Sequence, residues 1–263
     1  MKVAVLVKEV PATENVKMDE KTGTMIREGM DSELNPLDMY AVEEALRLKE
    51  RLKDVTVSVI SMGPPHAVNS VKEAISMGCD EGYLLSDRAF AGSDTLATAY
   101  ALGRALEKLG PFDLVLTGER ATDGETGQVG PSVATQLGMP VATYVSKVIS
   151  LNSKFVRVQR SIEGGKETIE MEMPALLSVV KEINEPRIPN LSGKIKAKSQ
   201  SIPKLSANEI EVDPEKTGLT GSPTRVVKVF YPKVSRNGKV IECKDVEDAV
   251  NQLLNFMKEK GVI

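Results

Sequence analysis

Short runs of consecutive apolar residues alternate with stretches of helical periodicity through the first 140 residues of the chain. Uninterrupted apolar runs rich in β-branched residues are typical of strands buried on both faces of a parallel sheet. Such runs predict strands at 3–7, 55–60, 83–85, 112–117 and 175–180. Their alternation with helices predicts an α/β fold with a doubly wound, mostly parallel, Rossmann-like sheet and right-handed crossovers.

Apolar residues at a spacing of three and four predict the helices between these strands. The first helix is expected to begin at Asn35-Pro36, because Asn35 is a good N-cap and Pro36 suits the first helical position. Further helices are predicted to begin near Val68, at a Ser93 cap and near Gln128. In the helix after Ser93, five residues are expected to face the core: Leu96, Ala99, Leu102, Leu106 and Leu109.

The pattern changes after residue 140. Residues 155–162 and 166–173 alternate between apolar and polar with a period of two around a turn with two glycines, which predicts an added β-hairpin. Another hairpin is expected around 19–23. From Glu185 onward the chain is rich in Pro, Lys and Ser, which predicts an extended segment. Residues 246–257 predict one amphipathic helix, which we expect to pack on another chain.

Composition excludes several classes of function. The net charge is −3 and there is no Trp among the 263 residues, so we expect no nucleic-acid binding. The two cysteines, Cys79 and Cys243, are expected to be reduced thiols. The N-terminus has too short an apolar stretch for a secretion signal, and no apolar run approaches the ~18 residues of a membrane span. We therefore expect a cytoplasmic protein without membrane insertion.

A glycine-rich polar loop, ATDGETGQVGPS at 121–132, follows the strand predicted at 112–117. In open α/β sheets, ligands bind at the carboxyl ends of the strands, where the strand order reverses. Glycines let backbone N–H groups come close to a phosphate, and a helix starting near Gln128 would point its positive N-terminus at that phosphate. Asp123 either accepts a hydrogen bond from a ribose hydroxyl or shapes the turn. The loop therefore predicts a nucleotide site; the alternative is a loop whose glycines only form turns.

The usual signatures of nucleotide-dependent enzymes are missing. The sequence has no G-x-x-x-x-G-K-[ST] motif and no G-x-G-x-x-G after the first strand. The single histidine, His66, is expected to begin a helix, with contact to a ligand as the alternative. One histidine and two distant cysteines provide neither a metal site nor a nucleophile–base pair. We therefore predict no catalytic residue and no metal, in a chain that carries a cofactor.

Five pieces of the sequence resemble the beta, or small, subunit of electron-transferring flavoproteins. They are VLVKEVP at 5–11, LNPLDMYAVEEALRLKE at 34–50, SMGPP at 61–65, DGETGQVGP at 123–131, and NEPR at 184–187 followed by KIKAK at 194–198. They occur in the order of the family and span nearly the whole chain. The combination is therefore much more specific than any single piece.

The resemblance implies a nucleotide-binding α/β domain at 1–185, a partner-recognition loop and linker at 186–225, and a C-terminal arm at 226–263 that packs on the large (alpha) subunit. In the common form of the family, the beta subunit holds AMP. In the electron-bifurcating form, FAD takes that place and accepts electrons from NADH. One electron then passes to ferredoxin, and the other passes through the large-subunit FAD to an acyl-CoA dehydrogenase-type partner.

Two stretches resemble the bifurcating form: SDRAFAGSDTLATA at 86–99 and DGETGQVGP at 123–131. AMP-type relatives carry a bulkier acidic–Cys–Asn run where this chain has Gly124 to Gly127, and small residues there leave room for an isoalloxazine. The bifurcating form is therefore the preferred interpretation. The alternatives are a conventional subunit with a structural AMP and a nucleotide-sensing scaffold without electron transfer.

The resemblance also implies which residues bind. The nucleotide site is expected to contain Leu6, Asn35, Pro36, Met62, Asp123, Gly124, Glu125, Thr126, Gly127, Gln128, Val129, Gly130, Pro131, Ser132 and Ala134. We add Asp94, Thr95 and Thr98 for the bifurcating site, with simple helix capping as the alternative. Leu191 matches the leucine of the family's recognition loop, which anchors the dehydrogenase. For Lys194, Lys196 and Lys198 the alternative to partner binding is a solvated basic face.

The chain is therefore expected to be a subunit of a multi-subunit flavin oxidoreductase rather than an enzyme alone. The sequence leaves the terminal acceptor open. Complexes that reduce caffeyl-CoA, crotonyl-CoA or another enoyl-CoA, and lactate dehydrogenase complexes, all use such subunits.

Overall fold

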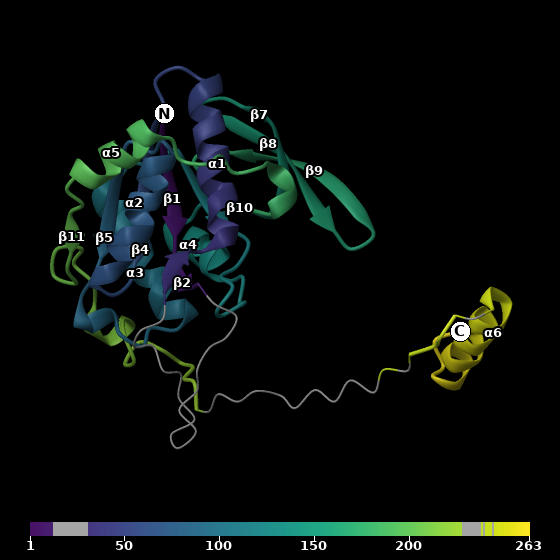
Figure 1. Ribbon diagram of the computed structural model, residues 1–263. Helices are drawn as coiled ribbons and strands as arrows, with labels where there is room; N and C mark the ends of the chain where they lie inside the picture. The colour runs from purple at the N-terminus through teal and green to yellow at the C-terminus, as the bar shows by residue number, and fades with distance from the viewer. Residues whose placement is uncertain (13–30, 228–237, 239, 244) are drawn as a thin grey trace. The chain divides into compact units, whose positions relative to one another are not determined.

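A computed structural model describes the whole chain except residues 13–30, 228–237, 239 and 244 (Figure 1). The chain divides into two compact units, Met1–Val227 and Lys228–Ile263, which are considered separately. The first unit contains the predicted α/β domain. The functional roles predicted for 1–185, 186–225 and 226–263 stay predictions.

The described residues of the first unit form a nine-stranded sheet with the order β11-β5-β4-β1-β6-β10-β7-β8-β9 and a small sheet of β2 and β3. The strands are β1 (Lys2–Val7), β2 (Glu9–Pro11), β3 (Ser32–Leu34), β4 (Thr56–Met62), β5 (Glu81–Leu85), β6 (Leu114–Gly118), β7 (Val141–Leu151), β8 (Phe155–Ile162), β9 (Gly165–Glu172), β10 (Ala175–Val179) and β11 (Lys204–Leu205). The helices are α1 (Pro36–Arg51), α2 (Val68–Met77), α3 (Thr95–Leu109), α4 (Val129–Leu137), α5 (Leu191–Ser199) and, in the second unit, α6 (Val246–Glu259). Short 3₁₀ turns are η1 (Pro65–Ala67), η2 (Arg88–Phe90), η3 (Lys181–Ile183) and η4 (Pro214–Lys216).

The sheet is parallel from β11 to β7 and ends in the antiparallel pair β8 and β9. This confirms the predicted α/β fold with a mostly parallel sheet and the added hairpin. The strand predicted at 175–180 is β10, which inserts between β6 and β7 and pairs with both of them. Because β10 comes late in the chain, this crossover was not predictable from the alternation of elements.

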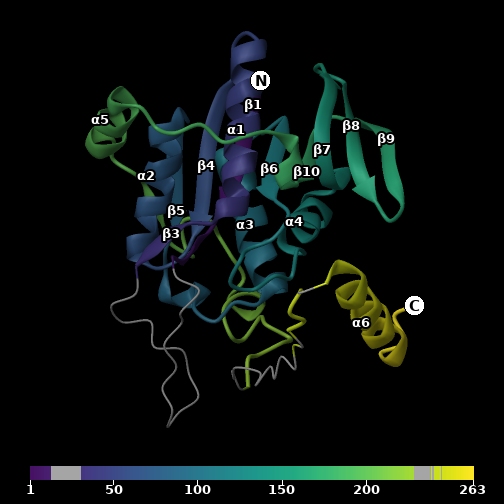
Figure 2. The same ribbon diagram turned by 45° about the vertical axis from the view of Figure 1, so that its right-hand side comes forward.

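Helices cover both faces of the sheet (Figure 2), and an apolar core lies between the sheet and the helices on each face. Alternate residues of β1 serve both cores: Val3 and Val5 face α1 and α2, whereas Ala4 and Leu6 face α3 and α4. Burial on both faces is the physical reason for the continuous apolar run of this strand. The same holds for β6, where Leu114 to Leu116 are 0% exposed. β1 and β6 therefore form a rigid centre for the sheet.

The structure corrects two predictions for α3. The N-cap of α3 is Asp94, whose carboxylate accepts hydrogen bonds from Leu96 N and Ala97 N, and not Ser93. Ser93 Oγ instead accepts a hydrogen bond from Gly218 N at 3.0 Å. Leu96, predicted to face the core, is 49% exposed, whereas its neighbour Ala97 is buried.

The segment after Glu185 is not simply extended, since it contains α5, which Asn190 caps. The strand β7 was also not predicted, because its residues mix exposed and buried positions irregularly. The hairpin predicted around 19–23 lies outside the described residues.

In the second unit, α6 confirms the predicted amphipathic helix. Asp245 accepts a hydrogen bond from Glu247 N and caps its first turn. No described residue of α6 is buried, and Val246, Val250, Leu253 and Leu254 are 40–69% exposed. In the part of the chain that the structure describes, no helix combines the length and apolarity needed to cross a bilayer.

Leu116→Ala should destabilise the chain by about 2–5 kcal/mol, because the leucine is 0% exposed and its removal leaves a cavity at the centre of the sheet. The measurement is urea unfolding of the ligand-free chain. Leu191→Ala is the matched control: Leu191 is 75% exposed, and its loss should change the free energy of unfolding by less than about 0.5 kcal/mol. Equal effects of the two substitutions would contradict the described core.

Candidate functional site

The strand order reverses between β1 and β6. The chain leaves β1 towards β4 on one side, and it leaves β6 towards β7 on the other side. Leu6 and Thr117 are paired in register near the carboxyl ends of these two strands. In open α/β sheets this is the crevice in which ligands bind. The glycine-rich loop begins directly after β6, so the sequence-predicted loop does lie at the switch point.

Two polar contacts connect the chain after β1 to the loop after β6. Lys8 Nζ lies 2.6 and 2.8 Å from the carboxylate oxygens of Asp123. Asn35 Nδ2 donates to Arg120 O at 2.9 Å, and Thr122 N donates to Asn35 Oδ1 at 3.3 Å. Asn35 is 0% exposed and stands at the N-cap position of α1, but its side chain makes no capping hydrogen bond. It holds the glycine loop instead, which corrects the predicted capping role.

Asp38, in the first turn of α1, adds a third contact. Its Oδ2 accepts a hydrogen bond from Lys8 N at 2.8 Å, and the residue is only 6% exposed. Burial raises the pKa of Asp38 to about 7, although hydrogen bonds from Lys8 N, the Asn35 side chain and Gly118 N favour the ionised form. A Cβ on Gly118 would lie 2.5 Å from Asp38 Oδ1, so only glycine fits at the end of β6. Asp38 is not among the site residues predicted from the sequence.

The N-terminus of α4 faces the same strand end. Gln128 is its N-cap residue, but no side chain caps the helix. Gly130 packs so closely on β6 that a Cβ would lie 2.8 Å from Thr117 Oγ1. The Thr117 hydroxyl is buried and has no hydrogen-bond partner among the residues that the structure describes. An uncapped helix N-terminus beside an unpartnered buried hydroxyl suits a phosphate group, because both supply donors.

The glycines of the loop differ in what they do. Gly127 has a φ of +62°, and a Cβ there would lie 3.2 Å from Glu119 O, so this position needs glycine for the backbone alone. Gly124 has no atom within 4 Å of a built Cβ and therefore borders open space. Gly124 is therefore the loop glycine that leaves room beside the loop and that the backbone itself does not require.

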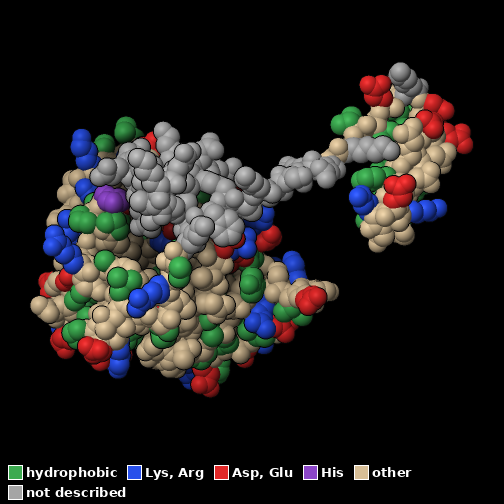
Figure 3. All heavy atoms as spheres, turned by 90° about the horizontal axis from the view of Figure 1, so that it is seen from below, with side chains coloured by type: hydrophobic (Ala, Val, Ile, Leu, Met, Phe, Trp, Pro, Cys, Tyr) green, Lys and Arg blue, Asp and Glu red, His purple; other side chains and the backbone are tan. Residues whose placement is uncertain are grey.

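The remaining predicted residues fall into two groups. Leu6 and Met62 lie at the carboxyl ends of the neighbouring strands β1 and β4, and Pro36 begins α1. Asp123 to Ser132 and Ala134 belong to the loop and to α4, where Ala134 is 0% exposed. These residues thus lie at the carboxyl ends of β1, β4 and β6 and at the starts of α1 and α4. Figure 3 looks from below, the end towards which β1 runs in Figure 1, and shows basic and acidic side chains interspersed among apolar ones.

Asp94, Thr95 and Thr98 form the second group, at the start of α3. Oδ1 of Asp94 accepts from two backbone N–H groups of α3, and Oδ2 accepts from the backbone N–H and the hydroxyl of Thr224. Both oxygens of Asp94 therefore already have partners within the chain. A place for these three residues in the ligand site stays a prediction.

His66 lies in η1, which leads into α2, as predicted. Its Nε2 is 3.0 Å from Oε1 of Glu9, whose other carboxylate oxygen is buried without a partner. No group of His, Cys, Asp and Glu among the described residues is arranged to hold a metal ion. Cys79 is buried, and burial raises the pKa of its thiol to about 12, so it is unreactive.

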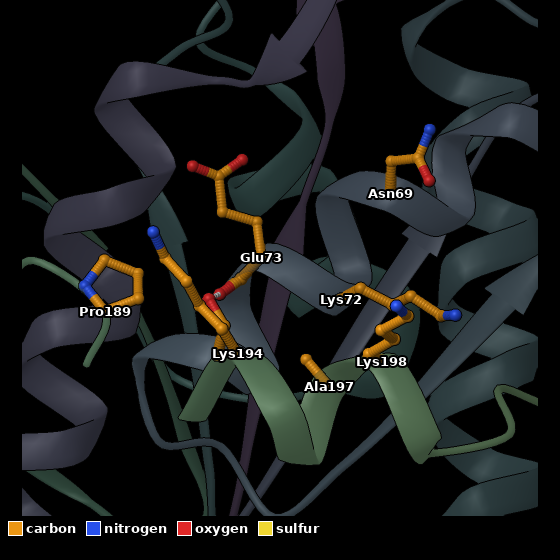
Figure 4. Close-up of a pocket in the computed structure, with 8 residues that line it drawn as sticks. Asn69, Lys72, Glu73, Pro189, Lys194, Ala197 and Lys198 are labelled. Carbon is orange, nitrogen blue, oxygen red and sulfur yellow. Dashed lines mark hydrogen bonds between the residues drawn. The ribbon is translucent and has the colours of Figure 1, made fainter. Parts of the chain in front are cut away.

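Leu191 is the first residue of α5 and is 75% exposed, far more than a core leucine. A groove of about 490 Å³ lies between α5 and α2, lined by Asn69, Lys72, Glu73, Ser76, Pro189, Lys194, Ala197 and Lys198 (Figure 4). Lys196 differs from the neighbouring lysines, because its Nζ donates to Cys79 O at 2.9 Å. Lys194, Lys196 and Lys198 are all exposed, so both partner binding and a solvated basic face stay open for them.

The fold is an open, mostly parallel α/β sheet with a glycine-rich loop at its switch point. The family described as "Electron transfer flavoprotein domain" matches residues 22–210. An electron transfer flavoprotein subunit beta of Thermoanaerobacterium thermosaccharolyticum is 45% identical over 264 residues, covering 100% of both chains. The caffeyl-CoA reductase-Etf complex subunit CarD of Acetobacterium woodii is 44% identical over 263 residues, again covering both chains fully. Protein FixA of Azotobacter vinelandii is 39% identical over 252 residues, 93% of this chain and 89% of its own.

The chain belongs to the family of electron transfer flavoprotein beta subunits. This confirms the resemblance stated from the sequence pieces.

Asp38→Asn should change the pH dependence of stability. The folded-state pKa lies above the ordinary value of 3.8, so the stability that this carboxyl contributes is complete at low pH and is lost as the pH rises through about 7. The free energy of unfolding of the wild type minus that of the variant should therefore fall by about 1 kcal/mol per pH unit between about pH 5 and pH 7. Denaturant titrations of the ligand-free chain measure it, with Asp113→Asn as control. Parallel pH profiles of the wild type and Asp38→Asn would show that Asp38 is not buried as described.

Proposed function

We propose that the chain is the small subunit of an electron-bifurcating electron transfer flavoprotein and holds FAD in the crevice between β1 and β6. The observation that carries this proposal is the open space beside Gly124, in a loop that otherwise closes tightly on the switch point. A planar three-ring group needs such space, whereas a mononucleotide does not. The full-length relative named as a subunit of a caffeyl-CoA reductase-Etf complex supports the same proposal.

The residues of the crevice divide the binding task. Thr117 and the N–H groups at the start of α4 would hold phosphate oxygens, since the Thr117 hydroxyl has no partner among the described residues and no described side chain caps the helix. Asn35 and Asp38 fix the position of the loop through the backbone. Lys8 and Asp123 form the rim of the crevice, with side chains that are 48% and 27% exposed. Bound FAD supplies the redox chemistry, and the chain supplies orientation and hydrogen bonds.

In this proposal the electrons come from NADH. One goes to ferredoxin, and the other goes through the FAD of the large subunit to an acyl-CoA dehydrogenase-type or lactate dehydrogenase partner, in a cytoplasmic complex. Leu191 on α5 is the proposed anchor for that partner. The exposed apolar side chains of α6 are proposed to pack on the large subunit, because a helix without a buried residue gains stability only from a second surface.

A second candidate is a conventional subunit that holds AMP in the same crevice. The uncapped start of α4 and the Thr117 hydroxyl suit the phosphate of either nucleotide. The two candidates differ in whether a ring system occupies the space beside Gly124.

Gly124→Leu tests the choice between FAD and AMP. The substitution should leave the free energy of unfolding within about 0.5 kcal/mol, because nothing lies within 4 Å of the new Cβ and no positive φ is required. If FAD fills that space, the complex with the large subunit should lose the second flavin and keep the large-subunit FAD. The measurement is FAD and AMP released per heterodimer. Gly165→Leu, in an equally open place at the hairpin, is the control. Retention of two FAD by Gly124→Leu would contradict the proposed site.

Thr117→Val tests the phosphate contact. The two side chains have nearly the same shape, and the hydroxyl has no partner in the ligand-free chain, so its loss should leave stability unchanged or slightly higher. If the hydroxyl binds a phosphate, the nucleotide should bind about 10-fold or more weakly, since a hydrogen bond to a charged group contributes about 1.5–3 kcal/mol. Isothermal titration of the apo complex with FAD and AMP measures this. Unchanged affinity would place the phosphates elsewhere.

A further inference from the structure

Two glutamates of α1, on the side of the helix away from the nucleotide crevice, are almost buried. The side chains of Glu43 and Glu44 are 4% and 6% exposed. Carboxylates are rarely buried to this degree unless they are paired. The segment 184–190, which runs across α1 from η3 to α5, supplies most of their partners (Figure 2).

Arg187 is the centre of this contact. Its Nε donates to Glu43 Oε2 at 2.7 Å, its Nη2 to Glu43 Oε1 at 3.2 Å, and its Nη1 to Glu50 Oε1 at 2.6 Å. Burial acts to raise the pKa of Glu43, but the hydrogen bonds from Arg187 and Arg47 outweigh it, so the pKa lies below its usual value. The planar fork of an arginine matches a carboxylate with two parallel hydrogen bonds, which a lysine cannot reproduce.

Further contacts fix the segment before Arg187. Asn184 Nδ2 donates to Tyr40 O at 3.0 Å and to Glu44 Oε2 at 3.2 Å. Arg47 Nη2 donates to Glu185 O at 3.2 Å. We call residues 184–187 together with their partners on α1 the clasp. It holds the chain that enters α5 by charge-assisted hydrogen bonds at several consecutive positions.

α5 itself rests on the C-terminal end of α2 through polar contacts. A Cβ on Gly193 would lie 2.0 Å from Ser76 O, so the two backbones touch and only glycine fits. Gln200 Nε2 donates to Asp80 O at 3.0 Å, as Lys196 Nζ does to Cys79 O. Figure 4 shows α5 lying across α2, with Ala197 directed towards it.

Apolar burial cannot hold α5 in place, because Ala197 is its only buried residue. Its larger apolar neighbours point outward: Ile188 is 89%, Leu191 75% and Ile195 61% exposed. The position of Leu191 therefore depends on the clasp and on the contacts with α2. Without them, a nine-residue helix of weak apolar character would be only marginally stable.

We propose that Arg187 is a positioning residue for partner docking: by clasping Glu43 and Glu50 of α1, it holds α5 so that Leu191 is presented to the dehydrogenase partner in a preformed place. A preformed surface does not lose the conformational entropy of ordering a helix when the partner binds, which raises affinity without adding a contact. This inference rests on the proposed function of Leu191, and its test separates the two.

The test uses the full chain in complex with the large subunit. Amide hydrogen exchange at 191–200 reports the order of α5. Steady-state kinetics use NADH as electron donor, with ferredoxin as one acceptor and a purified acyl-CoA dehydrogenase, supplied with crotonyl-CoA, as the other. The variants are Arg187→Ala, Arg187→Lys, Glu50→Gln and Leu191→Ala, with Arg157→Ala as a control that breaks the comparable exposed pair with Glu170 on the hairpin.

Arg187→Ala should speed exchange at 191–200 about 10-fold or more and raise KM for the dehydrogenase to a similar degree. It should leave kcat at saturating dehydrogenase and the rate of flavin reduction by NADH unchanged. For Arg187→Lys, the exchange rate at 191–200 and the KM for the dehydrogenase should fall between those of the wild type and those of Arg187→Ala. Glu50→Gln should change the exchange rate and KM in the same direction by a smaller factor. Because the Glu50 side chain is 59% exposed, this variant should fold and replaces Arg187→Ala if that variant does not. Arg157→Ala should behave as wild type.

The outcomes separate the inference from the proposed function. If Leu191→Ala raises KM but the Arg187 and Glu50 variants do not, the clasp is not a positioning device and the inference is overturned. If Leu191→Ala has no effect on KM, the proposed partner site fails. In that case the exchange rates still decide whether Arg187 orders α5, and unchanged exchange in Arg187→Ala would overturn the inference on its own.

Discussion

Two buried polar side chains at the start of α1, Asn35 and Asp38, hold together the ends of β1 and β6, where the proposed nucleotide site lies. Asn35 binds the backbone on both sides of Ala121, and Asp38 binds the backbone N–H of Lys8 directly after β1. Unpaired buried polar groups are costly, so each of these contacts restricts the loops to one arrangement. The start of α1 thus fixes the loops that follow β1 and β6. The buried centre of the sheet, at β1 and β6, gives these loops a rigid base.

Against this fixed base, the groups without partners mark where a ligand fits. Among the described residues, the Thr117 hydroxyl is buried without a partner beside the start of α4, which no side chain caps. Gly124 borders open space, whereas Gly118, Gly127 and Gly130 are each required by a backbone or side chain close by. A site with tight floor contacts and one open side is consistent with a cofactor larger than a mononucleotide. Buried polar contacts also fix the segment that leads into α5, where Arg187 donates to Glu43 of α1.

The sequence predicted the parallel sheet and the position of the glycine-rich loop, because both depend on patterns that are local and strong. Continuous apolar runs mark strands buried on both faces, and a glycine-rich loop after a strand marks a switch point. Asn35 was assigned to the right place with the wrong partner, since a residue at a helix start can bond to its own helix or to a distant loop, and the sequence does not distinguish them. α5 was missed because polar contacts and a glycine-to-carbonyl approach hold it, and neither produces an apolar period. Asp38 escaped notice for the same reason, as its burial depends on the close approach of β6.

The central claim is that the crevice between β1 and β6 holds FAD rather than AMP. The most direct measurement is the nucleotide content of the wild-type heterodimer: the complex with the large subunit is purified, denatured, and its released FAD and AMP are quantified. We expect two FAD and no AMP per heterodimer. One FAD and one AMP would contradict it and leave a conventional carrier in which the same loop holds AMP.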